Sequence, residues 1–479
     1  MSRQPHIHTK ARWIALMGAL ALGGAAAESP PLAAATPPGQ ATSHKTASTP
    51  DIPFESYTLD NGLEVILHHD ASVPTVHTEL WYKVGSKDEE PGKTGFAHLF
   101  EHIMFQGTKH VPEDAHFKYL QEAGASNVNG TTSFDRTNYY ETLPANRLEL
   151  ALWLESSRMG FLLQRPSFQE TLDNQREVVK NERRQRVENQ PMGLVMQTQL
   201  EYLFPPSHPY LHEVIGSMED LGRASVSDIK AFFNRYYAPN NAILVVAGAF
   251  DAGEAKALVE KYFGPIPAGP PIVRSKPAPV ALEGPRKVEM EAKVNLPAVF
   301  LAWHSPAMYQ PGDAEMDVIA ALLSDGKTSR LYKRLVYDLK LAQRVDAYQW
   351  SLMNAGLFEI TATPLPGKTI EQLVPVIDEE LAKLASEPIT GQELERVKNK
   401  IKTNFFQGLE QVAGRAALLA QYKYFTGDPG FIARDLARYE AVTPASVQAF
   451  ARSMLRKDRR LTVTVTPNEQ APIMGRVKK

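Results

Sequence analysis

The segments SVSDIKAFFNRYYAPNNAILVVAG (residues 225–248) and TPASVQAFARSMLRKDRRLTVTVTP (residues 443–467) share one pattern. In each, a polar residue of the type that caps helix N-termini is followed by an amphipathic helix, a loop and an apolar strand. At an offset of 218 residues (443 minus 225), alanine, phenylalanine and valine recur, with Ala231, Phe232 and Val245 meeting Ala449, Phe450 and Val463. We infer that the chain contains an internal duplication.

The openings of the two predicted halves also match. Strands are predicted at residues 63–67 and 76–84, before the first long helix, and at 287–292 and 298–304, before a helix that begins near Asp313. Strands and long helices mix without a regular β-α-β alternation, which favours the α+β class over a doubly wound sheet. The sequence therefore predicts two homologous α+β halves, each a mixed sheet with helices.

Composition divides the chain into five parts. Residues 1–27 combine basic residues, an apolar run too short to span a bilayer and small residues at its end, which predicts a signal peptide and an exported, periplasmic protein. Residues 28–50 form a predicted flexible leader rich in Pro, Ala, Ser and Thr. A first folded domain (51–268), a Pro- and Gly-rich linker (269–286) and a second domain (287–479) follow. No membrane span is expected in the mature chain.

The composition excludes several classes of function. The 479 residues carry 52 Lys and Arg against 54 Asp and Glu, so the formal charge of −2 lacks the basic excess of a dedicated nucleic-acid-binding protein. The chain has no cysteine, which rules out disulfides, cysteine nucleophiles and thiolate metal sites. Any metal must be held by His, Asp or Glu.

The segment FAHLFEHIMFQGTKH, residues 96–110, carries the strongest chemical signal. Within a largely apolar helix, His98, Glu101 and His102 stand at positions i, i+3 and i+4, on one helix face. Two imidazoles at this spacing can bind one metal ion, and a divalent cation offsets the cost of burying the carboxylate. Zinc is the metal that such nitrogen and oxygen ligands favour. The alternative is a hydrogen-bonded histidine pair without a metal.

A catalytic zinc needs a third protein ligand. The candidate segment is a helix of about 20 residues beginning near Thr171. Glu177, Glu182 and Glu188 all lie on it, and their spacing alone does not choose among them.

Other polar residues near these segments have simpler interpretations. Arg183, Arg184 and Arg186 are interpreted as a solvent-facing stripe on the same helix. His110 and His116 are interpreted as members of a polar loop.

Several motifs in one order give the chain a family resemblance. It resembles the pitrilysin- or insulinase-type zinc metallopeptidases, which include insulin-degrading enzyme and the mitochondrial processing peptidase. The resemblance covers nearly everything from residue 51 onward and implies two halves that face each other as a clam shell. The matching segments are HLFEH from His98, NVNGTTSFDRTNYYETLP from Asn127, REVVKNERR from Arg176, HPY from His208 and YYAPNNAILVVAG from Tyr236.

The resemblance assigns roles to individual residues. His98, His102 and Glu182 match the ligands of one zinc ion per chain, and Glu101 matches the general base. Gln175 stands seven residues before Glu182, where the family often has a glutamate, so an amide replaces a charge beside the ligands.

The resemblance also implies a peptide-binding strand. Residues 129–133 match the family's edge strand, which holds an extended substrate by adding it to the sheet. Gly130 and Thr131 would offer backbone groups there, and Asn129 would contact the substrate.

One departure concerns the second half. Active members carry an Arg and a Tyr seven residues apart, and the aligned positions here are Val336 and Gln343. Arg330 and Tyr337 are also seven apart but lie six residues early, and we interpret them as helix-face and core residues. A related zinc-less subunit would then supply the pair and complete the site, and a homodimer is the alternative assembly.

The expected function is that of an exported zinc metalloendopeptidase, which cuts short or unfolded peptides with a zinc-activated water. One alternative is a non-catalytic, structural or chaperone-like subunit of the same family. Another is a peptide-binding module with a purely structural zinc, for which a fourth protein ligand would be expected.

Overall fold

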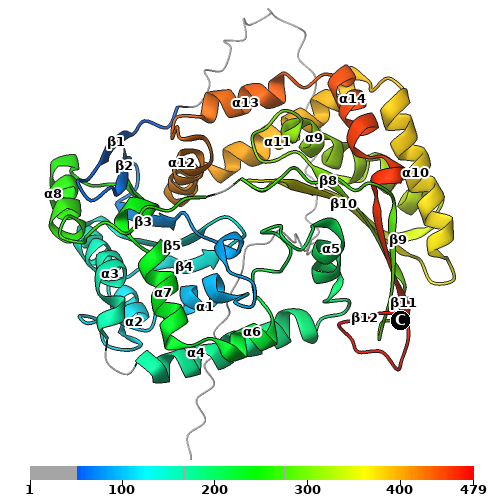
Figure 1. Cartoon of the computed structure of the whole chain (residues 1–479). Helices are drawn as coiled ribbons and strands as arrows, with labels where there is room; N and C mark the ends of the chain where they lie inside the picture. The colour runs from blue at the N-terminus through cyan, green and yellow to red at the C-terminus, as the bar shows by residue number, and fades with distance from the viewer. Residues whose placement is uncertain (1–50, 166–167, 275, 479) are drawn as a thin grey trace, which may run out of the picture. The chain divides into compact units, whose positions relative to one another are not determined.

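The computed structural model describes residues 51–165, 168–274 and 276–478 (Figure 1). These residues belong to one compact unit, and the predicted signal peptide and leader lie outside them. Among the described residues no helix has the length and apolar character needed to cross a membrane.

The first half is built on a six-stranded mixed sheet with the order β1-β2-β6-β3-β5-β4. Only β2 and β6 pair in parallel, and β4 is an edge strand. The strands are β1 (Glu55–Thr58), β2 (Glu64–His69), β3 (Thr75–Tyr82), β4 (Ser126–Thr132), β5 (Thr137–Pro144) and β6 (Ala242–Gly248).

The second half repeats this topology with the order β12-β7-β11-β8-β10-β9. Again one internal pair, β7 and β11, is parallel, and β9 takes the edge position that β4 has in the first sheet. The predicted fold class, two homologous α+β halves, is confirmed. The strands are β7 (Arg286–Ala292), β8 (Ala298–Ser305), β9 (Ala342–Trp350), β10 (Gly356–Pro364), β11 (Leu461–Pro467) and β12 (Arg476–Val477).

The two segments that indicated the duplication form equivalent elements. Ser225 caps helix α7 (Val226–Tyr236), and its hydroxyl accepts the amide of Asp228 at 3.2 Å. Thr443 caps helix α14 (Pro444–Met454), and its hydroxyl accepts the amide of Ser446 at 3.0 Å. Each helix then leads into an apolar central strand, β6 or β11. Local capping and strand-forming residues therefore specify the same unit twice.

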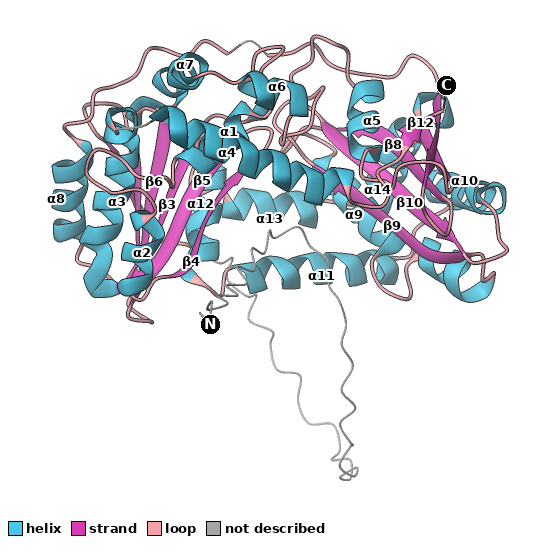
Figure 2. Ribbon diagram, turned by 90° about the horizontal axis from the view of Figure 1, so that it is seen from below, coloured by secondary structure: helices cyan, strands magenta, loops and turns pink. Residues whose placement is uncertain are grey.

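Helices cover both sheets (Figure 2). The first half contains α1 (Phe96–Ile103), α2 (Ala115–Glu122), α3 (Leu148–Phe161), α4 (Phe168–Arg183), α5 (Val195–Leu203), α6 (Met218–Arg223), α7 (Val226–Tyr236) and α8 (Ala252–Phe263). The second contains α9 (Asp313–Ser324), α10 (Ile370–Ser386), α11 (Gly391–Gly408), α12 (Val412–Thr426), α13 (Ile432–Glu440) and α14 (Pro444–Met454). Short π-helical segments span Arg184–Glu188 and Tyr332–Asp338.

Each half contributes a helix to the other half's sheet. Helix α12 of the second half packs on β6, β3 and β2, where Ala416 and Leu419 share an apolar cluster with Trp81 and Ile243. Helix α5 of the first half packs on β11 and β8 of the second sheet. Because both exchanged helices bury apolar side chains, the two halves share cores and are not independent bodies joined by a linker.

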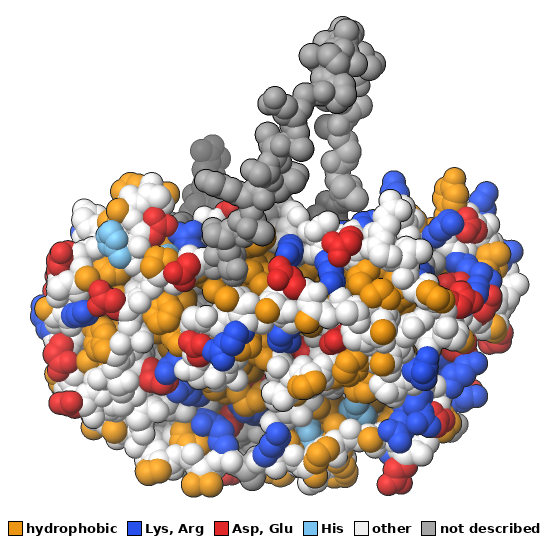
Figure 3. All heavy atoms as spheres, turned by 90° about the horizontal axis from the view of Figure 1, so that it is seen from above, with side chains coloured by type: hydrophobic (Ala, Val, Ile, Leu, Met, Phe, Trp, Pro, Cys, Tyr) orange, Lys and Arg blue, Asp and Glu red, His pale blue; other side chains and the backbone are white. Residues whose placement is uncertain are grey.

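The face seen in Figure 3 carries acidic and basic side chains interspersed with hydrophobic ones. This agrees with the near-balanced formal charge of −2. The predicted division at residues 268 and 286 remains a prediction.

Candidate metal centre

Helix α1 begins at a left-handed residue, Gly95, whose φ of 88° few other residues adopt without strain. The buried Glu89 carboxylate accepts the amides of Gly95 at 2.9 Å and Ala97 at 2.7 Å, so it satisfies two of the free amides at the helix start. Burial raises the pKa of Glu89 well above its usual range. These contacts fix the start of the helix on which His98 and His102 lie.

The second segment of the site is the long helix α4, which begins at Phe168, three residues before the predicted start, and continues into the π-helical turn Arg184–Glu188. Helix α4 packs against α1. Glu182 lies in the last α-helical turn, next to the change in helix type, a feature that is frequent at functional sites. Glu177 is exposed and pairs with Lys180 at 2.8 Å, so it points away from α1.

Packing of α1 on α4 brings His98, His102 and Glu182 together. One ligand atom from each lies within 4.8 Å of the other two, and the described residues contain no other such group of three or more His, Asp or Glu side chains. Glu182 Oε2 lies 3.2 Å from His102 Nε2 and 3.8 Å from His98 Nε2. The two imidazole rings stand nearly perpendicular, with centroids 4.9 Å apart.

This donor set fits a zinc ion. Two imidazole nitrogens and one carboxylate oxygen are the ligands of an open, three-residue catalytic site rather than of a closed structural one. His98 is 8% exposed and Glu182 is only partly exposed, so the donors are held by packing. No Asp or Glu other than Glu182 joins the group among the described residues.

The site favours an ionised carboxylate and a neutral imidazole. Burial acts to raise the pKa of Glu182, but the hydrogen bond from His102 and the charge of the two histidines outweigh it and lower the pKa to about 2. Burial, together with the charge of His102, lowers the pKa of His98 to about 3. A neutral imidazole and an ionised carboxylate are the forms that bind metal.

Glu101 lies between the two histidines in sequence but makes a different contact. Its Oε2 accepts a 2.6 Å hydrogen bond from Thr132 Oγ1, at the end of β4. The Glu101 side chain is buried, at 8% exposure, and burial raises its pKa. A buried carboxyl with a raised pKa beside a metal-ligand group is suited to taking up and releasing a proton.

Gln175 is buried on α4, seven residues before Glu182 and therefore on the same face of the helix. Its side-chain hydrogen bond to His102 helps to raise the pKa of that histidine, against the effect of burial. An amide at this position thus supports a histidine without adding a second negative charge.

The predicted peptide-binding residues Asn129, Gly130 and Thr131 all lie on β4, the edge strand of the first sheet. A Cβ atom on Gly130 would stand 3.1 Å from Glu101 Cγ and 3.0 Å from the rings of Phe105 and Tyr139. The close approach therefore favours glycine, and it brings β4 against the helix that carries Glu101. Contact of these residues with a substrate remains a prediction.

Of the two histidines interpreted as members of a polar loop, one was interpreted wrongly. His116 is not in a polar loop but is buried on α2, 5.4 Å from the Phe105 ring, and burial lowers its pKa well below the usual range. His110 does lie in a loop, against Phe161.

The basic run on α4 also divides. Arg183 is buried rather than solvent-facing, and it donates to the carbonyl of Gly216 at 2.8 Å. Arg186 is exposed and donates to Glu182 at 2.7 Å, while Arg184 is paired with Asn181 at the surface.

The second half has an equivalent helix without the metal ligands. Helix α9 also begins after a left-handed glycine, Gly312, with φ 95°. Counting from the two glycines, the positions of His98, Glu101 and His102 are taken by Glu315, Val318 and Ile319.

Val336 and Gln343, which align with the family's Arg and Tyr, do not form a pair in the structure. Val336 lies in the π-helical segment against the second core, and Gln343 is exposed on β9. Arg330 is paired with Glu393 at 2.8 Å. Tyr337 is 73% exposed, so its interpretation as a core residue was wrong.

Sequence reasoning did not identify Thr132 and Glu89, which hold Glu101 and the start of α1. Thr132 lies within the predicted edge strand, residues 129–133, and that position was the signal that could have found it. Glu89 carries no spacing signal, because its contact depends on a loop that folds back onto the helix.

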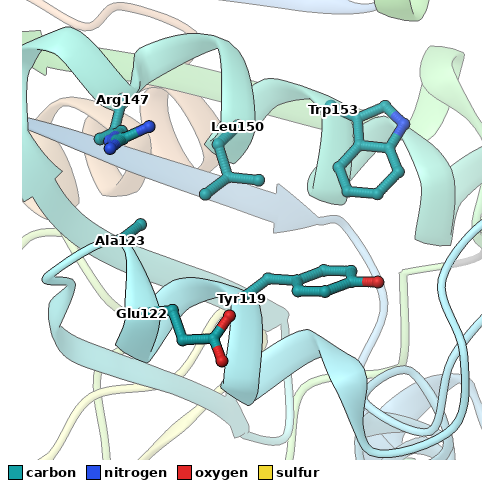
Figure 4. A pocket seen from close by; sticks show the side chains of 6 residues that line it. All are labelled: Tyr119, Glu122, Ala123, Arg147, Leu150 and Trp153. Carbon is teal, nitrogen blue, oxygen red and sulfur yellow. The ribbon is translucent and has the colours of Figure 1, made fainter.

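A pocket of about 340 Å³ lies elsewhere in the first half, between α2 and α3 (Figure 4). Glu122 and Arg147 are its only charged lining residues, and no histidine joins them. It does not have the donor set of a metal or catalytic centre. Its walls are Tyr119, Glu122, Ala123, Arg147, Leu150 and Trp153.

Comparison with known families places this geometry in context. Residues 64–202 match the model of the insulinase family, peptidase family M16, and residues 223–401 match the model described as the peptidase M16 inactive domain. The first match contains all the candidate site residues. The second contains α9, where the ligand positions are taken by other residues.

Curated relatives agree. The zinc protease PqqE of Helicobacter pylori is 32% identical over 382 residues, which cover 77% of this chain and 83% of that protein. An uncharacterized zinc protease of Mycobacterium leprae is 27% identical over 84% of this chain and 89% of that protein. The crystal structure of a protease from Helicobacter pylori has a TM-score of 0.79 at 28% identity and covers 87% of this chain and 100% of that one.

Proposed function

The chain belongs to the insulinase family, peptidase family M16, and on that premise we propose that it is a zinc-dependent endopeptidase that hydrolyses short or unfolded peptides. The observation that carries the proposal is the convergence of His98, His102 and Glu182 beside the buried carboxyl of Glu101. Three ligands leave room for a reacting water, as catalytic zinc sites require.

The proposed roles follow from the geometry. His98, His102 and Glu182 hold the zinc ion, one per chain. Zinc bound there supplies Lewis-acid chemistry, because it lowers the pKa of a water molecule and polarises a peptide carbonyl. Glu101 takes the proton from the attacking water at its carboxylate and later delivers it to the leaving amine. Its hydrogen bond from Thr132 leaves the other carboxylate oxygen free for this transfer.

The edge strand β4 is the proposed site for the peptide. Its outer edge has no partner strand among the described residues, so an extended peptide can pair with the backbone of Gly130 and Thr131. Helix α1 packs against β4, which would place a paired peptide near Glu101. Sequence-independent backbone pairing favours substrates that are unfolded or short.

Export and assembly belong to the same proposal. The N-terminal sequence supports passage across the inner membrane and a periplasmic location. The absence of the Arg and Tyr pair at Val336 and Gln343 supports a dimer in which a related zinc-less subunit supplies them, with a homodimer as the alternative assembly.

A non-catalytic role in the same family is the second candidate. The observation that favours it is the match of residues 223–401 to the inactive-domain model. That match lies largely in the second half, whereas the metal-ligand group lies in the first. We therefore place the peptidase first.

The test is hydrolysis of a quenched fluorescent peptide pool by the zinc-loaded protein. Without its partner, wild type is expected to hydrolyse the peptides only weakly, and Glu101→Gln to keep its zinc and lose that residual activity by at least about 100-fold. Glu177→Gln, an exposed glutamate on α4, is the matched control and should behave as wild type. Equal activity of Glu101→Gln and wild type would refute the proposal. Full activity of the isolated chain would refute the need for a related partner.

A further inference from the structure

The turn between β4 and β5 directly follows Thr132, which hydrogen-bonds the proposed base Glu101, and it reaches into the second half. Phe134, on this turn, is 1% exposed and packs against Tyr210 at 5.3 Å and against Trp350 of β9 at 5.1 Å between ring centroids. It belongs to the apolar cluster that includes residues of β7, β8, β10 and β11. A residue of the proposed substrate-binding hairpin is thus part of the other half's core.

Asp135, the next residue, adds polar contacts to the second half. Its carboxylate accepts the amide of Met353 at 3.0 Å and the hydroxyl of Tyr210 at 2.7 Å. Its carbonyl accepts the hydroxyl of Tyr424 on α12 at 2.8 Å and the ammonium of Lys87 at 2.7 Å. The carboxylate is 2% exposed, so each of these bonds is shielded from water.

The first half holds the same turn from the opposite side. The amides of Ser86 and Lys87 donate to the carbonyls of Ser133 and Phe134, at 3.1 and 3.0 Å. Gly85 lies directly under the turn, since a Cβ atom there would stand 2.4 Å from those two carbonyl oxygens. The turn therefore has one position, fixed by both halves.

Thr132 connects this turn to the chemistry. It is the last residue of β4, and its hydroxyl donates to Glu101 Oε2 at 2.6 Å. Any displacement of the turn moves Thr132, and with it the orientation of the Glu101 carboxylate. Glu101 itself is on α1, and among the described residues its side chain makes no hydrogen bond to the second half.

We propose that Thr132 is a positioning residue for Glu101, and that the second half contributes to catalysis by anchoring the β4–β5 turn through Phe134 and Asp135. This inference rests on the proposed peptidase function and deepens it. It gives the half without metal ligands a defined task at the site, apart from any group that a partner subunit supplies.

The first test compares three substitutions in steady-state peptide hydrolysis. Thr132→Val, which keeps the shape and removes the hydroxyl, is expected to lower kcat by about 10- to 100-fold with KM within about 2-fold, as loss of a hydrogen bond to a carboxylate predicts. Thr132→Ser is expected to restore most of kcat. Thr403→Val, an exposed residue on α11, is the control and should match wild type. Zinc content should equal one per chain in all of them. Wild-type kcat in Thr132→Val, or no rescue by serine, would overturn the role of Thr132.

The second test needs no activity. Asp135→Asn leaves one acceptor oxygen where the Met353 amide and the Tyr210 hydroxyl use two. Hydrogen exchange followed by mass spectrometry should therefore show faster exchange in residues 126–140 by about 10-fold or more, with α8 unchanged as the internal reference. A Thr132→Val and Glu101→Gln double-mutant cycle on urea unfolding should show coupling between the two side chains. Unchanged hydrogen exchange in the hairpin of Asp135→Asn would overturn the anchoring role of the turn. Strictly additive effects of Thr132→Val and Glu101→Gln on unfolding would overturn the contact between Thr132 and Glu101. If wild type neither binds zinc nor hydrolyses peptides while both of these results hold, the peptidase proposal fails and the positioning contact stands.

Discussion

Replacing Arg158 by methionine is expected to destabilise the first half strongly. Arg158 on α3 is 1% exposed and lies between two buried carboxyl groups. Its Nε is 2.8 Å from Glu155 Oε2, and its Nη2 is 3.8 Å from Glu141 Oε2. Its guanidinium also stacks on the rings of Phe105 and Tyr139, at 5.0 and 4.3 Å. The same two rings contact Gly130 on β4. The ion pair of Arg158 with Glu155 therefore supports the packing beside the proposed peptide-binding strand.

The magnitude follows from the charges. Burial, with the charge of Glu155, raises the pKa of Glu141 well above its usual range, and Thr78 donates to the same carboxyl. Arg158 bonds Glu155 directly and lies beside Glu141, so it is the counter-charge for this buried pair of carboxyl groups. Removing the arginine leaves one buried carboxylate without a counter-charge, which costs about 3–5 kcal/mol in the free energy of unfolding.

Urea denaturation followed by tryptophan fluorescence measures this cost. Arg434→Met, whose side chain is 63% exposed in its ion pair with Asp428, is the matched control and should cost less than about 1 kcal/mol. The double variant Arg158→Met, Glu155→Leu should recover most of the loss, because no unpaired charge remains. The deficit of the single variant should shrink as pH falls, since the folded state then takes up a proton at the orphaned carboxyl. A loss for Arg158→Met as small as that of the control would refute the argument.

Three further outcomes are expected. Glu182→Gln should weaken zinc binding by on the order of 100-fold or more, measured by competition with a chromophoric chelator. Glu188→Gln is the control and should bind zinc like wild type. Equal weakening in both variants would show that Glu182 is not the specific third ligand. Gly130→Val should overpack the space beside Glu101, costing about 1–3 kcal/mol and lowering kcat while zinc is retained, and normal kinetics would show that the close approach is not required. The half-buried His304 donates a hydrogen bond to the carbonyl of Leu203, and burial lowers its pKa to about 4. In the unfolded chain this histidine is protonated below about pH 6.5. The unfolded state then binds more protons, so the free energy of unfolding should fall as pH drops from 6.5 toward 4, by up to about 1.4 kcal/mol per pH unit. In urea titrations His304→Gln should flatten this pH dependence. An unchanged slope would show that His304 is not its source.

Elements with a local signal were predictable from the sequence. The caps at Ser225 and Thr443 and the apolar strands after them form as expected, because side chain and backbone groups only a few residues apart determine them. His98, Glu101 and His102 are on one helix face for the same reason, since their spacing matches the helical repeat.

Features that depend on packing between distant segments were not predictable in this way. Spacing left Glu177, Glu182 and Glu188 equal as ligand candidates, and only the contact of α1 with α4 brings Glu182 to the histidines. The resemblance to a known family had selected Glu182 before the geometry did. Arg183 was assigned to solvent because its partner carbonyl, on Gly216, lies 33 residues away in sequence.

Exchanged helices are the other feature without a local signal. Val412–Thr426 forms helix α12, but nothing in its sequence says that this helix covers the first sheet rather than the second. The same holds for Phe134, an apolar residue in a turn, which is buried only because the second half supplies its surroundings.

X-ray absorption spectroscopy at the zinc edge is the measurement that tests the central claim most directly. The account predicts one zinc per chain with two imidazole nitrogens and a carboxylate oxygen among its ligands, and the loss of one imidazole, or of the metal, in His102→Ala. A zinc bound by other ligands, or a spectrum that His102→Ala leaves unchanged, would contradict the assignment of His98, His102 and Glu182 as the metal centre.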